Sequence, residues 1–143
     1  MAAVYFDASA LVKLLVEEEG TDLVVALWDG CDVALSSRLA YPEVRAALAA
    51  AARNGRLDQA DLRAVERDWN HYWSSIRMIE LSEAVSHRAG DLCRAHALGG
   101  ADGVHLASAL AVDDGDLIMA VWDQRLHAAA DAAALRVAPA PRD

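Results

Sequence analysis

The stretch that decides the fold is Val4-Tyr5-Phe6-Asp7-Ala8-Ser9-Ala10-Leu11-Val12-Lys13-Leu14-Leu15. A short apolar run with two aromatic residues stops at the carboxylate of Asp7, and leucines at helical spacing follow a few small residues. This pattern predicts a buried strand, a tight turn and a helix. In open α/β sheets ligands bind beyond the carboxyl ends of the strands, so Asp7 is expected at that edge. A buried charge lowers stability unless a partner compensates it, and we expect a divalent metal ion in that role.

The alternation of apolar runs and helical patterns continues along the chain. Strands are expected over residues 4–6, 32–36, 76–81, 117–122 and 135–138. Helices are expected over residues 9–18, 22–28, 42–53, from 58 past 73, 83–97, 103–112 and 124–133. The expected helix caps are Ser9, Thr21 and Ser82, Asp58 is expected to open its helix, and Pro42 suits a first helical position. Strands that alternate with helices indicate an α/β fold, with a parallel sheet covered on both faces.

The bulk composition indicates one globular domain. The chain has 143 residues, of which 55% are hydrophobic, and we expect the domain over residues 1–138 and a frayed tail over 139–143. Cys31 and Cys93 match no metal-ligand spacing, so free thiols in a reducing cytoplasm are expected. No run approaches the roughly 18 apolar residues of a membrane span, and no basic segment precedes the first apolar run. These features predict a soluble, cytoplasmic protein with no membrane partner.

The charge balance argues against one class of nucleic-acid-binding protein. Lys and Arg number 13, Asp and Glu number 22, and the net charge is −9. A protein that coats nucleic acid needs a basic face. A nuclease is still compatible with this charge, because metal ions would neutralise part of an acidic cluster.

Four carboxylates are predicted to meet at one edge of the sheet. Asp7 and Asp123 each end a buried strand, and Glu43 and Asp102 each begin a helix. Carboxyl ends of parallel strands and the starts of the following helices share that edge. Four close carboxylates would raise one another's pKa, and hard cations such as Mg²⁺ or Mn²⁺ relieve the repulsion. Sites of this kind hydrolyse phosphodiesters.

Structural interpretations of the same residues stay open. Taken singly, Glu43 and Asp102 also suit helix N-termini, where a negative charge favours the dipole, and Asp123 also suits a helix cap. Asp7 is the hardest to explain in this way, because it closes a run that is meant for burial. His105 follows Asp102 by three residues and is either near the site or a packed histidine. The stripe with Trp69 and Trp73 fits a core or a partner interface better than a base-stacking platform.

At this point four segments resemble the motifs of PIN-domain nucleases. The opening motif is similar to Asp7-Ala8-Ser9-Ala10-Leu11-Val12-Lys13-Leu14, and the second acidic motif to Pro42-Glu43-Val44. The most recognisable motif is similar to Ala101-Asp102-Gly103-Val104-His105-Leu106-Ala107-Ser108-Ala109, and the last to Trp122-Asp123-Gln124-Arg125-Leu126. Order and spacing match over nearly the whole chain. Gly103 departs from the usual Ala, and Val121 stands where Thr or Ser is common.

The resemblance implies a three-layer α/β/α fold with a central parallel five-stranded sheet in the order 3-2-1-4-5. It implies metal-binding, catalytic acids at Asp7, Glu43, Asp102 and Asp123, with Ser9 at a position where a hydroxyl often supports the site. The implied cofactor is Mg²⁺, with Mn²⁺ as an alternative, and the implied activity is hydrolysis of phosphodiester bonds within RNA.

The size of the chain resembles the VapC-type toxins of bacterial toxin–antitoxin pairs. That resemblance implies an RNA substrate, a cognate VapB-type antitoxin and a homodimer. We expect the antitoxin on the helices after the first two strands, where the apolar side chains are Leu14, Leu15, Trp28, Trp69 and Trp73. A housekeeping RNA-processing nuclease without an antitoxin, and a non-catalytic module of the same fold, are the alternatives.

Overall fold

A parallel five-stranded sheet forms the centre of the computed structural model, which describes residues 2–142. The strands are β1 (Ala3–Phe6), β2 (Val33–Ser37), β3 (Ile76–Ile79), β4 (Ile118–Ala120) and β5 (Arg136–Ala138). They lie in the order β3-β2-β1-β4-β5, and every neighbouring pair is parallel. The predicted fold class and strand order are confirmed. Because β1 is central, its carboxyl end lies in the middle of one sheet edge.

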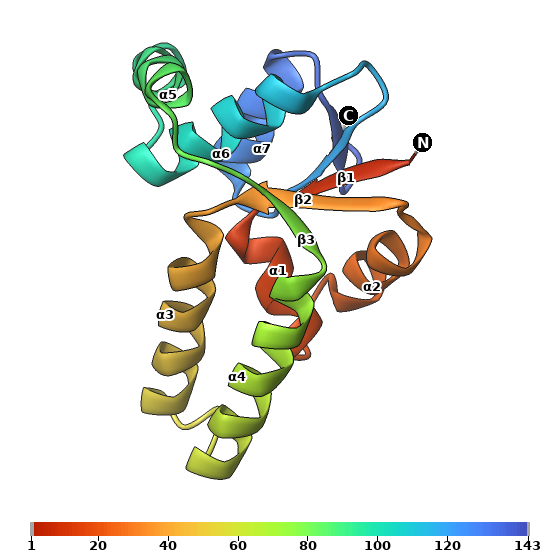
Figure 1. Ribbon diagram of the computed structural model, residues 1–143, viewed down its shortest axis with the longest axis vertical. Helices are drawn as coiled ribbons and strands as arrows, with labels where there is room; N and C mark the ends of the chain where they lie inside the picture. Colours follow the sequence, from red (N-terminus) through yellow and green to blue (C-terminus); the bar gives the residue numbers. More distant parts are fainter. Residues whose placement is uncertain (1, 143) are drawn as a thin grey trace.

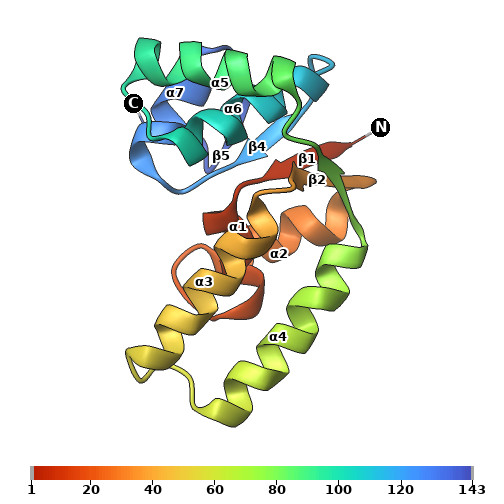
Figure 2. The ribbon, with the colours of Figure 1, turned by 60° about the vertical axis from the view of Figure 1, so that its left-hand side comes forward.

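Helices cover both faces of the sheet, as Figures 1 and 2 show. One face carries α1 (Ala8–Leu15), α2 (Thr21–Gly30), α3 (Ala40–Arg53) and α4 (Gln59–Ser74). The other carries α5 (Glu83–His96), α6 (Gly100–Val112) and α7 (Gln124–Ala132). The three-layer arrangement that the resemblance implied is therefore confirmed.

The side chains of β1 alternate between the two cores. Val4 and Phe6 pack with Leu11 of α1 on one face, while Tyr5 packs with Leu106 of α6 on the other. All five are buried, and full burial of a large apolar side chain contributes about 1.5–3 kcal/mol. Burial on both faces explains why the first strand is apolar without the polar alternation of a half-exposed strand.

Several helix starts differ from the sequence-based expectations. Ser9 is not the cap of α1, because Asp7 holds that position and the Ser9 hydroxyl donates to it. Thr21 lies inside α2 after Gly20; its hydroxyl accepts the Glu18 N–H of the preceding loop and donates to the Lys13 carbonyl of α1. Helix α3 begins at Ala40, so Pro42 is its third residue and not its first; the missing N–H still does no harm, since the first four N–H groups of a helix lack partners.

Other boundaries are partly confirmed. Asp58 caps α4 through a capping box, and Ser82 caps α5. Helix α6 begins at Gly100, earlier than expected, so Asp102 lies within its first turn. Strand β3 ends at Ile79 and β4 covers only Ile118–Ala120, so both expected strands were too long.

Helices α3 and α4 form a hairpin, which extends away from the sheet (Figure 2). Arg45 of α3 pairs with Glu66 of α4 at 2.9 Å. Trp69 is fully buried, with its indole N–H donating to the Tyr41 carbonyl over 3.3 Å, and Trp73 packs against both rings. The expectation that Trp69 offers partner-binding surface is wrong, because its ring fills the core between this hairpin and the sheet.

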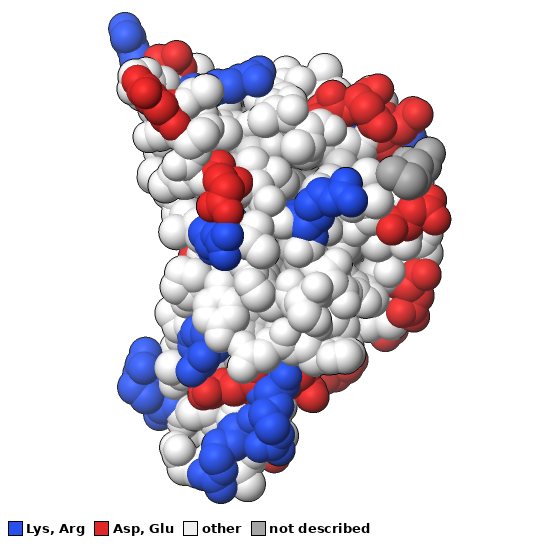
Figure 3. Space-filling model, viewed as in Figure 1, with Lys and Arg blue, Asp and Glu red and all other residues white. Residues whose placement is uncertain are grey.

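The net negative charge is unevenly distributed over the surface. On the face in Figure 3, Lys and Arg side chains gather at the lower end, where Figure 1 places α3 and α4, and carboxylates line the right-hand edge. None of the helices within residues 2–142 has the length and apolarity needed to cross a bilayer.

Near the C-terminus, His127 Nε2 lies 2.7 Å from the Pro139 carbonyl oxygen. The predicted tail includes Asp143, which lies outside the described residues, and the domain limits stay a prediction.

Candidate active site

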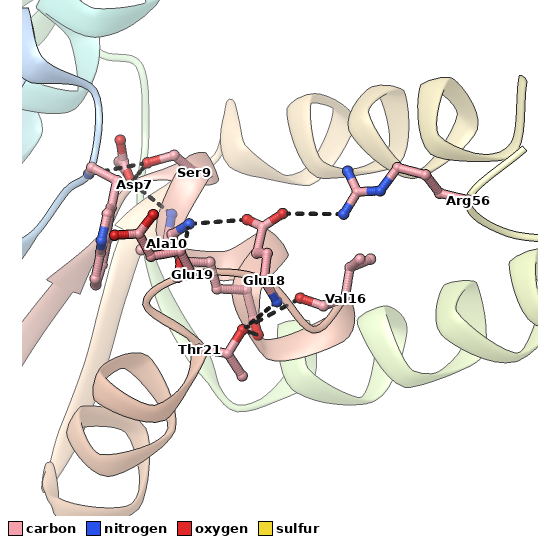
Figure 4. A network of polar contacts seen from close by, with 10 residues as sticks. Asp7, Ser9, Ala10, Val16, Glu18, Glu19, Thr21 and Arg56 are labelled. Carbon is pink, nitrogen blue, oxygen red and sulfur yellow. Dashed lines mark hydrogen bonds and ion pairs between the residues drawn. The ribbon is translucent and has the colours of Figure 1, made fainter. Parts of the chain in front are cut away.

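Asp7 lies directly after β1 and is the N-cap of α1. Its carboxylate is buried, with the residue 4% exposed. The Ser9 hydroxyl donates to Oδ1 over 2.6 Å and the Ala10 N–H donates to the same atom over 2.9 Å (Figure 4). Both hydrogen bonds that residues 2–142 donate to this carboxylate reach Oδ1. No described residue donates to Oδ2, which is therefore available to a metal ion.

The environment of Asp7 opposes its ionisation. Burial raises the pKa of Asp7 from its usual 3.8 to about 6, and the negative charge of Asp102 acts in the same direction. His105 and the hydrogen bonds from Ser9 and Ala10 act against this rise. A buried carboxylate with a raised pKa beside a second acid is typical of a functional site.

Asp102 and Asp123 face one cleft of about 680 Å³, whose other lining residues are Gly99, Gln124 and Arg125. Asp123 caps α7, and its Oδ1 accepts the Leu126 N–H over 2.9 Å. Burial raises the pKa of Asp102, and the charges of Asp123 and Glu43 raise it further, while Arg125 lowers it. The carboxylates of the β4–α7 connection and of α6 therefore lie in one electrostatic environment.

Glu43 reaches the same region from the first turn of α3. Its Oε1 lies 2.6 Å from Nε2 of His105, and Nδ1 of His105 lies 2.8 Å from the Tyr5 hydroxyl. Both the histidine and the tyrosine are buried. Burial raises the pKa of Tyr5 well above its ordinary value, so the hydroxyl keeps its proton. A buried polar chain thus joins β1, α6 and α3 beneath the acids.

The donor set suits a hard cation. Mg²⁺ prefers oxygen ligands and is often bound by one or two carboxylates, with water and substrate phosphate completing its shell. In the described part of the chain, no three His, Cys, Asp or Glu side chains lie close enough to hold one ion between them. The residues therefore fit an ion that is held by few carboxylates and open to substrate, and not a closed protein cage.

The sequence pattern that defines the PIN domain matches residues 4–131. This chain belongs to the PIN-domain family. The matched residues include the four acids, so the family assignment covers the whole candidate site.

Relatives and solved structures agree with this assignment. Ribonuclease VapC49 from Mycobacterium tuberculosis strain H37Rv is 64% identical over 143 residues, covering 100% of this chain and 99% of that protein. The FitAcB structure from Neisseria gonorrhoeae is 19% identical with a TM-score of 0.69, over 94% of this chain and 95% of the other. A toxin–antitoxin complex from Klebsiella pneumoniae is 19% identical with a TM-score of 0.56, over 84% and 86% of the two chains. The two structures support the fold of the PIN domain.

Contacts of Trp122 hold the segment that contains Asp123 against α1 of this PIN domain. The Trp122 N–H donates to the Ser9 hydroxyl over 3.4 Å, and the Lys13 ammonium lies 5.2 Å from the centre of the Trp122 ring. Gly20 lies under that ring with a left-handed φ of +93°, and a Cβ there would come within 2.7 Å of the indole nitrogen. Asp123 directly follows Trp122, so this packing fixes its backbone.

Lys13 is itself held in place by the loop after α1. Its ammonium donates to the Glu19 carbonyl over 2.7 Å and to Glu18 over 3.0 Å. Arg56, in the connection between α3 and α4, donates to the other Glu18 oxygen over 3.4 Å (Figure 4). A lysine that is 8% exposed needs such partners, because an unpaired buried charge is costly. The network joins the first motif of the PIN domain to the α3–α4 hairpin.

The predicted site residues differ in how closely the structure links them. Asp102 and Asp123 share the cleft. The charge of Glu43 raises the pKa of Asp102, and the charge of Asp102 raises the pKa of Asp7. Asp7 and Glu43 are not among the residues that line this cleft in the described chain. Ser9 contacts Asp7 directly, in agreement with the hydroxyl that the resemblance implied.

The polar contact of Tyr5 was not predicted from the sequence, and His105 was predicted either to lie near the site or to be a packed histidine. His105 is indeed packed, but it also contacts Glu43. One available signal was its position three residues after Asp102, about one helical turn away, which points both side chains to the same side of α6. Nothing in the apolar run of β1 distinguishes the Tyr5 hydroxyl from an ordinary aromatic side chain.

Proposed function

We propose that this PIN domain is a Mg²⁺- or Mn²⁺-dependent endoribonuclease, the toxin of a VapBC-type toxin–antitoxin pair. The observation that carries the proposal is that acids far apart in the sequence come together: Asp102 and Asp123 line one cleft, and the charges of Glu43 and Asp102 reach Asp102 and Asp7, respectively. The 64% identity to a ribonuclease over the full chain supports RNA as the substrate.

The reaction is hydrolysis of a phosphodiester bond. Water attacks phosphorus in line, the bond to the 3′ oxygen breaks, and that oxygen leaves with a proton. When bound, a divalent ion supplies charge stabilisation at the phosphate and lowers the pKa of the attacking water. Asp7 would offer Oδ2 to such an ion, Asp102 and Asp123 would offer oxygens at the cleft, and Glu43 would support them from α3.

Arg125 is the basic residue best placed to hold the substrate. It lines the cleft beside Asp102 and Asp123, and its guanidinium donates to the Ala97 carbonyl over 3.2 Å. One such bond leaves other guanidinium N–H groups for a phosphate oxygen. Arg45, also near a motif in sequence, already pairs with Glu66 and contacts Tyr41.

An antitoxin, a homodimer and a cytoplasmic location complete the proposal. A structurally similar protein is described as a toxin–antitoxin complex, and the basic side chains at the lower end of the face in Figure 3 offer positive charge to a partner with acidic residues. Growth arrest on expression, relieved by a small protein encoded beside it, would support a toxin. Normal growth with RNA cleavage in vitro would instead support a housekeeping nuclease.

The decisive experiment measures RNA cleavage by purified protein with Mg²⁺, with Mn²⁺ and with EDTA. Cleavage is expected with either ion and not with the chelator. Asp7→Asn and Asp102→Asn should abolish cleavage while circular dichroism stays unchanged, and Asp68→Asn, on the exposed face of α4, should cleave like the parent. RNA cleavage that survives in either site variant would refute the proposed chemistry, and metal binding without cleavage would favour a non-catalytic module.

A further inference from the structure

His105 is buried at the junction of three elements that carry the candidate site. It belongs to α6, is 1% exposed, and lies between Tyr5 of β1 and Glu43 of α3. The Tyr5 and His105 rings meet edge to face, with centres 5.9 Å apart and planes at 77°. Both ring nitrogens are engaged, Nδ1 at 2.8 Å from the Tyr5 hydroxyl and Nε2 at 2.6 Å from Glu43 Oε1.

The chemistry of the two partners fixes the direction of these bonds. An ionised carboxylate can only accept, so Nε2 carries the proton that is shared with Glu43. A phenolic hydroxyl can donate, so Tyr5 satisfies Nδ1 as an acceptor. With the proton on Nε2, each of the two hydrogen bonds, from Tyr5 to His105 and from His105 to Glu43, has one donor and one acceptor. The Tyr5 hydroxyl favours this tautomer, because it donates to Nδ1.

We propose that His105 is a positioning residue for Glu43 and that Tyr5 fixes the orientation and the protonated nitrogen of the His105 ring. One Glu43 oxygen is then held by the protein, and the other faces the candidate metal site. This inference rests on the proposed function and deepens it. The Tyr5 hydroxyl acts through His105, and His105 acts through Glu43, so neither touches substrate.

The contacts of Glu43 show why it needs such a partner. Its side chain is 28% exposed, so without a bond it would sample several rotamers over the edge of the site. Among residues 2–142, His105 is its one side-chain hydrogen-bond donor, and it reaches only Oε1. Holding a long side chain in advance lowers the entropic cost of binding an ion.

The same hydrogen-bonded residues lie next to two further acids in the chain. His105 follows Asp102 by three residues in α6, and Tyr5 of β1 precedes Asp7 by two residues. Outer partners that orient ligand side chains typically matter by about 10–100-fold in metal affinity or activity. That range sets the size of the expected effect.

Two substitutions separate positioning from packing. His105→Gln places an amide N–H near the former Nε2 and keeps a donor for Glu43, whereas His105→Asn is shorter and keeps only a partner for Tyr5. Mn²⁺ affinity, measured by calorimetry, should fall about 10–100-fold in His105→Asn and only a few-fold in His105→Gln. His127→Asn, which removes a histidine outside the site, should bind Mn²⁺ like the parent. Equal losses in the two His105 variants, or no loss in either, would overturn the proposal.

A double substitution tests whether His105 acts through Glu43. If it does, adding His105→Asn to Glu43→Gln should lower the Mn²⁺ affinity by less than about three-fold, because the link is already broken. A full additional loss would show that His105 acts by another route and would overturn the inference.

An NMR measurement on the unsubstituted protein gives a readout that needs no metal. Long-range ¹H–¹⁵N spectra of the imidazole should show a protonated Nε2 for His105, and Tyr5→Phe should shift the Nδ1 resonance. An unprotonated Nε2 overturns the inference even if the site variants fail to fold. A parent protein that neither binds Mn²⁺ nor cleaves RNA would end the proposed function and this inference together, whereas normal parent activity with unaffected His105 variants would end this inference alone.

Discussion

Replacing Asp7 with Asn should make the metal-free protein more stable while it removes activity. The carboxylate is buried and its pKa is raised from 3.8 to about 6, a shift of about two units. At about 1.4 kcal/mol per unit, ionised Asp7 costs the folded state about 3 kcal/mol at neutral pH. Asn keeps an acceptor for Ser9 and Ala10 and carries no charge.

The pH dependence gives this prediction a defined sign. Because the folded pKa lies above the unfolded value, the parent loses stability as pH rises from 3.8 to about 6, while the variant has no such loss. The stability advantage of Asp7→Asn should therefore grow from about 1 kcal/mol at pH 4.5 to about 3 kcal/mol at pH 7.5, and level off above pH 6.

Urea titrations with EDTA, followed by tryptophan fluorescence, measure this difference at several pH values. The exposed variant Asp68→Asn removes the same charge and should differ from the parent by less than about 0.5 kcal/mol. A stability gap between parent and Asp7→Asn that does not change between pH 4.5 and 7.5, or a less stable variant at pH 7.5, would refute the account of a destabilised acid.

Three further outcomes are expected. Gly103→Ala should destabilise the protein by about 1–3 kcal/mol, because the new Cβ would meet Cys93 Sγ and lie 2.8 Å from the Ala89 carbonyl oxygen. Gly90→Ala, with open space around it, should instead stabilise the protein by up to about 1 kcal/mol. Urea titration measures both changes, and a Gly103→Ala variant more stable than the parent would contradict the close packing at this position. Asp58→Ala should cost about 0.5–2 kcal/mol through loss of the α4 capping box, measured as a lower urea midpoint, and an unchanged midpoint would show that the cap is dispensable. Mn²⁺ should raise the melting temperature of the parent and not that of Asp7→Asn, and equal shifts in both would exclude Asp7 as a ligand.

The fold was largely predictable because its signals are local and strong. The run from Val4 to Phe6 is apolar on both sides, and the alternation of such runs with helical patterns indicates a parallel sheet without knowledge of contacts. The strand order came only through the family resemblance, since no local pattern fixes which strands are neighbours. The helix starts at Ser9 and Pro42 were wrong because residue preferences identify a turn but not the residue that caps it.

The acids could be placed at one edge from the sequence, but their partners could not. Asp7 follows from the end of a strand, and Asp102 from the start of a helix after a turn. The contact between Glu43 and His105 joins residues 62 positions apart, and it depends on how α3 and α6 approach each other. The tight approach at Gly103 was equally hidden, because helix propensity alone favours Ala there.

Gly20 has a consequence for how this protein could lose its activity. It has no side-chain functional group, and it is distant in sequence from Asp123, yet the indole of Trp122 packs against its α-carbon. Any side chain at position 20 would displace that ring and move the adjoining Asp123 out of line. A genetic screen for inactive alleles should therefore recover substitutions at Gly20 as well as substitutions of the four acids.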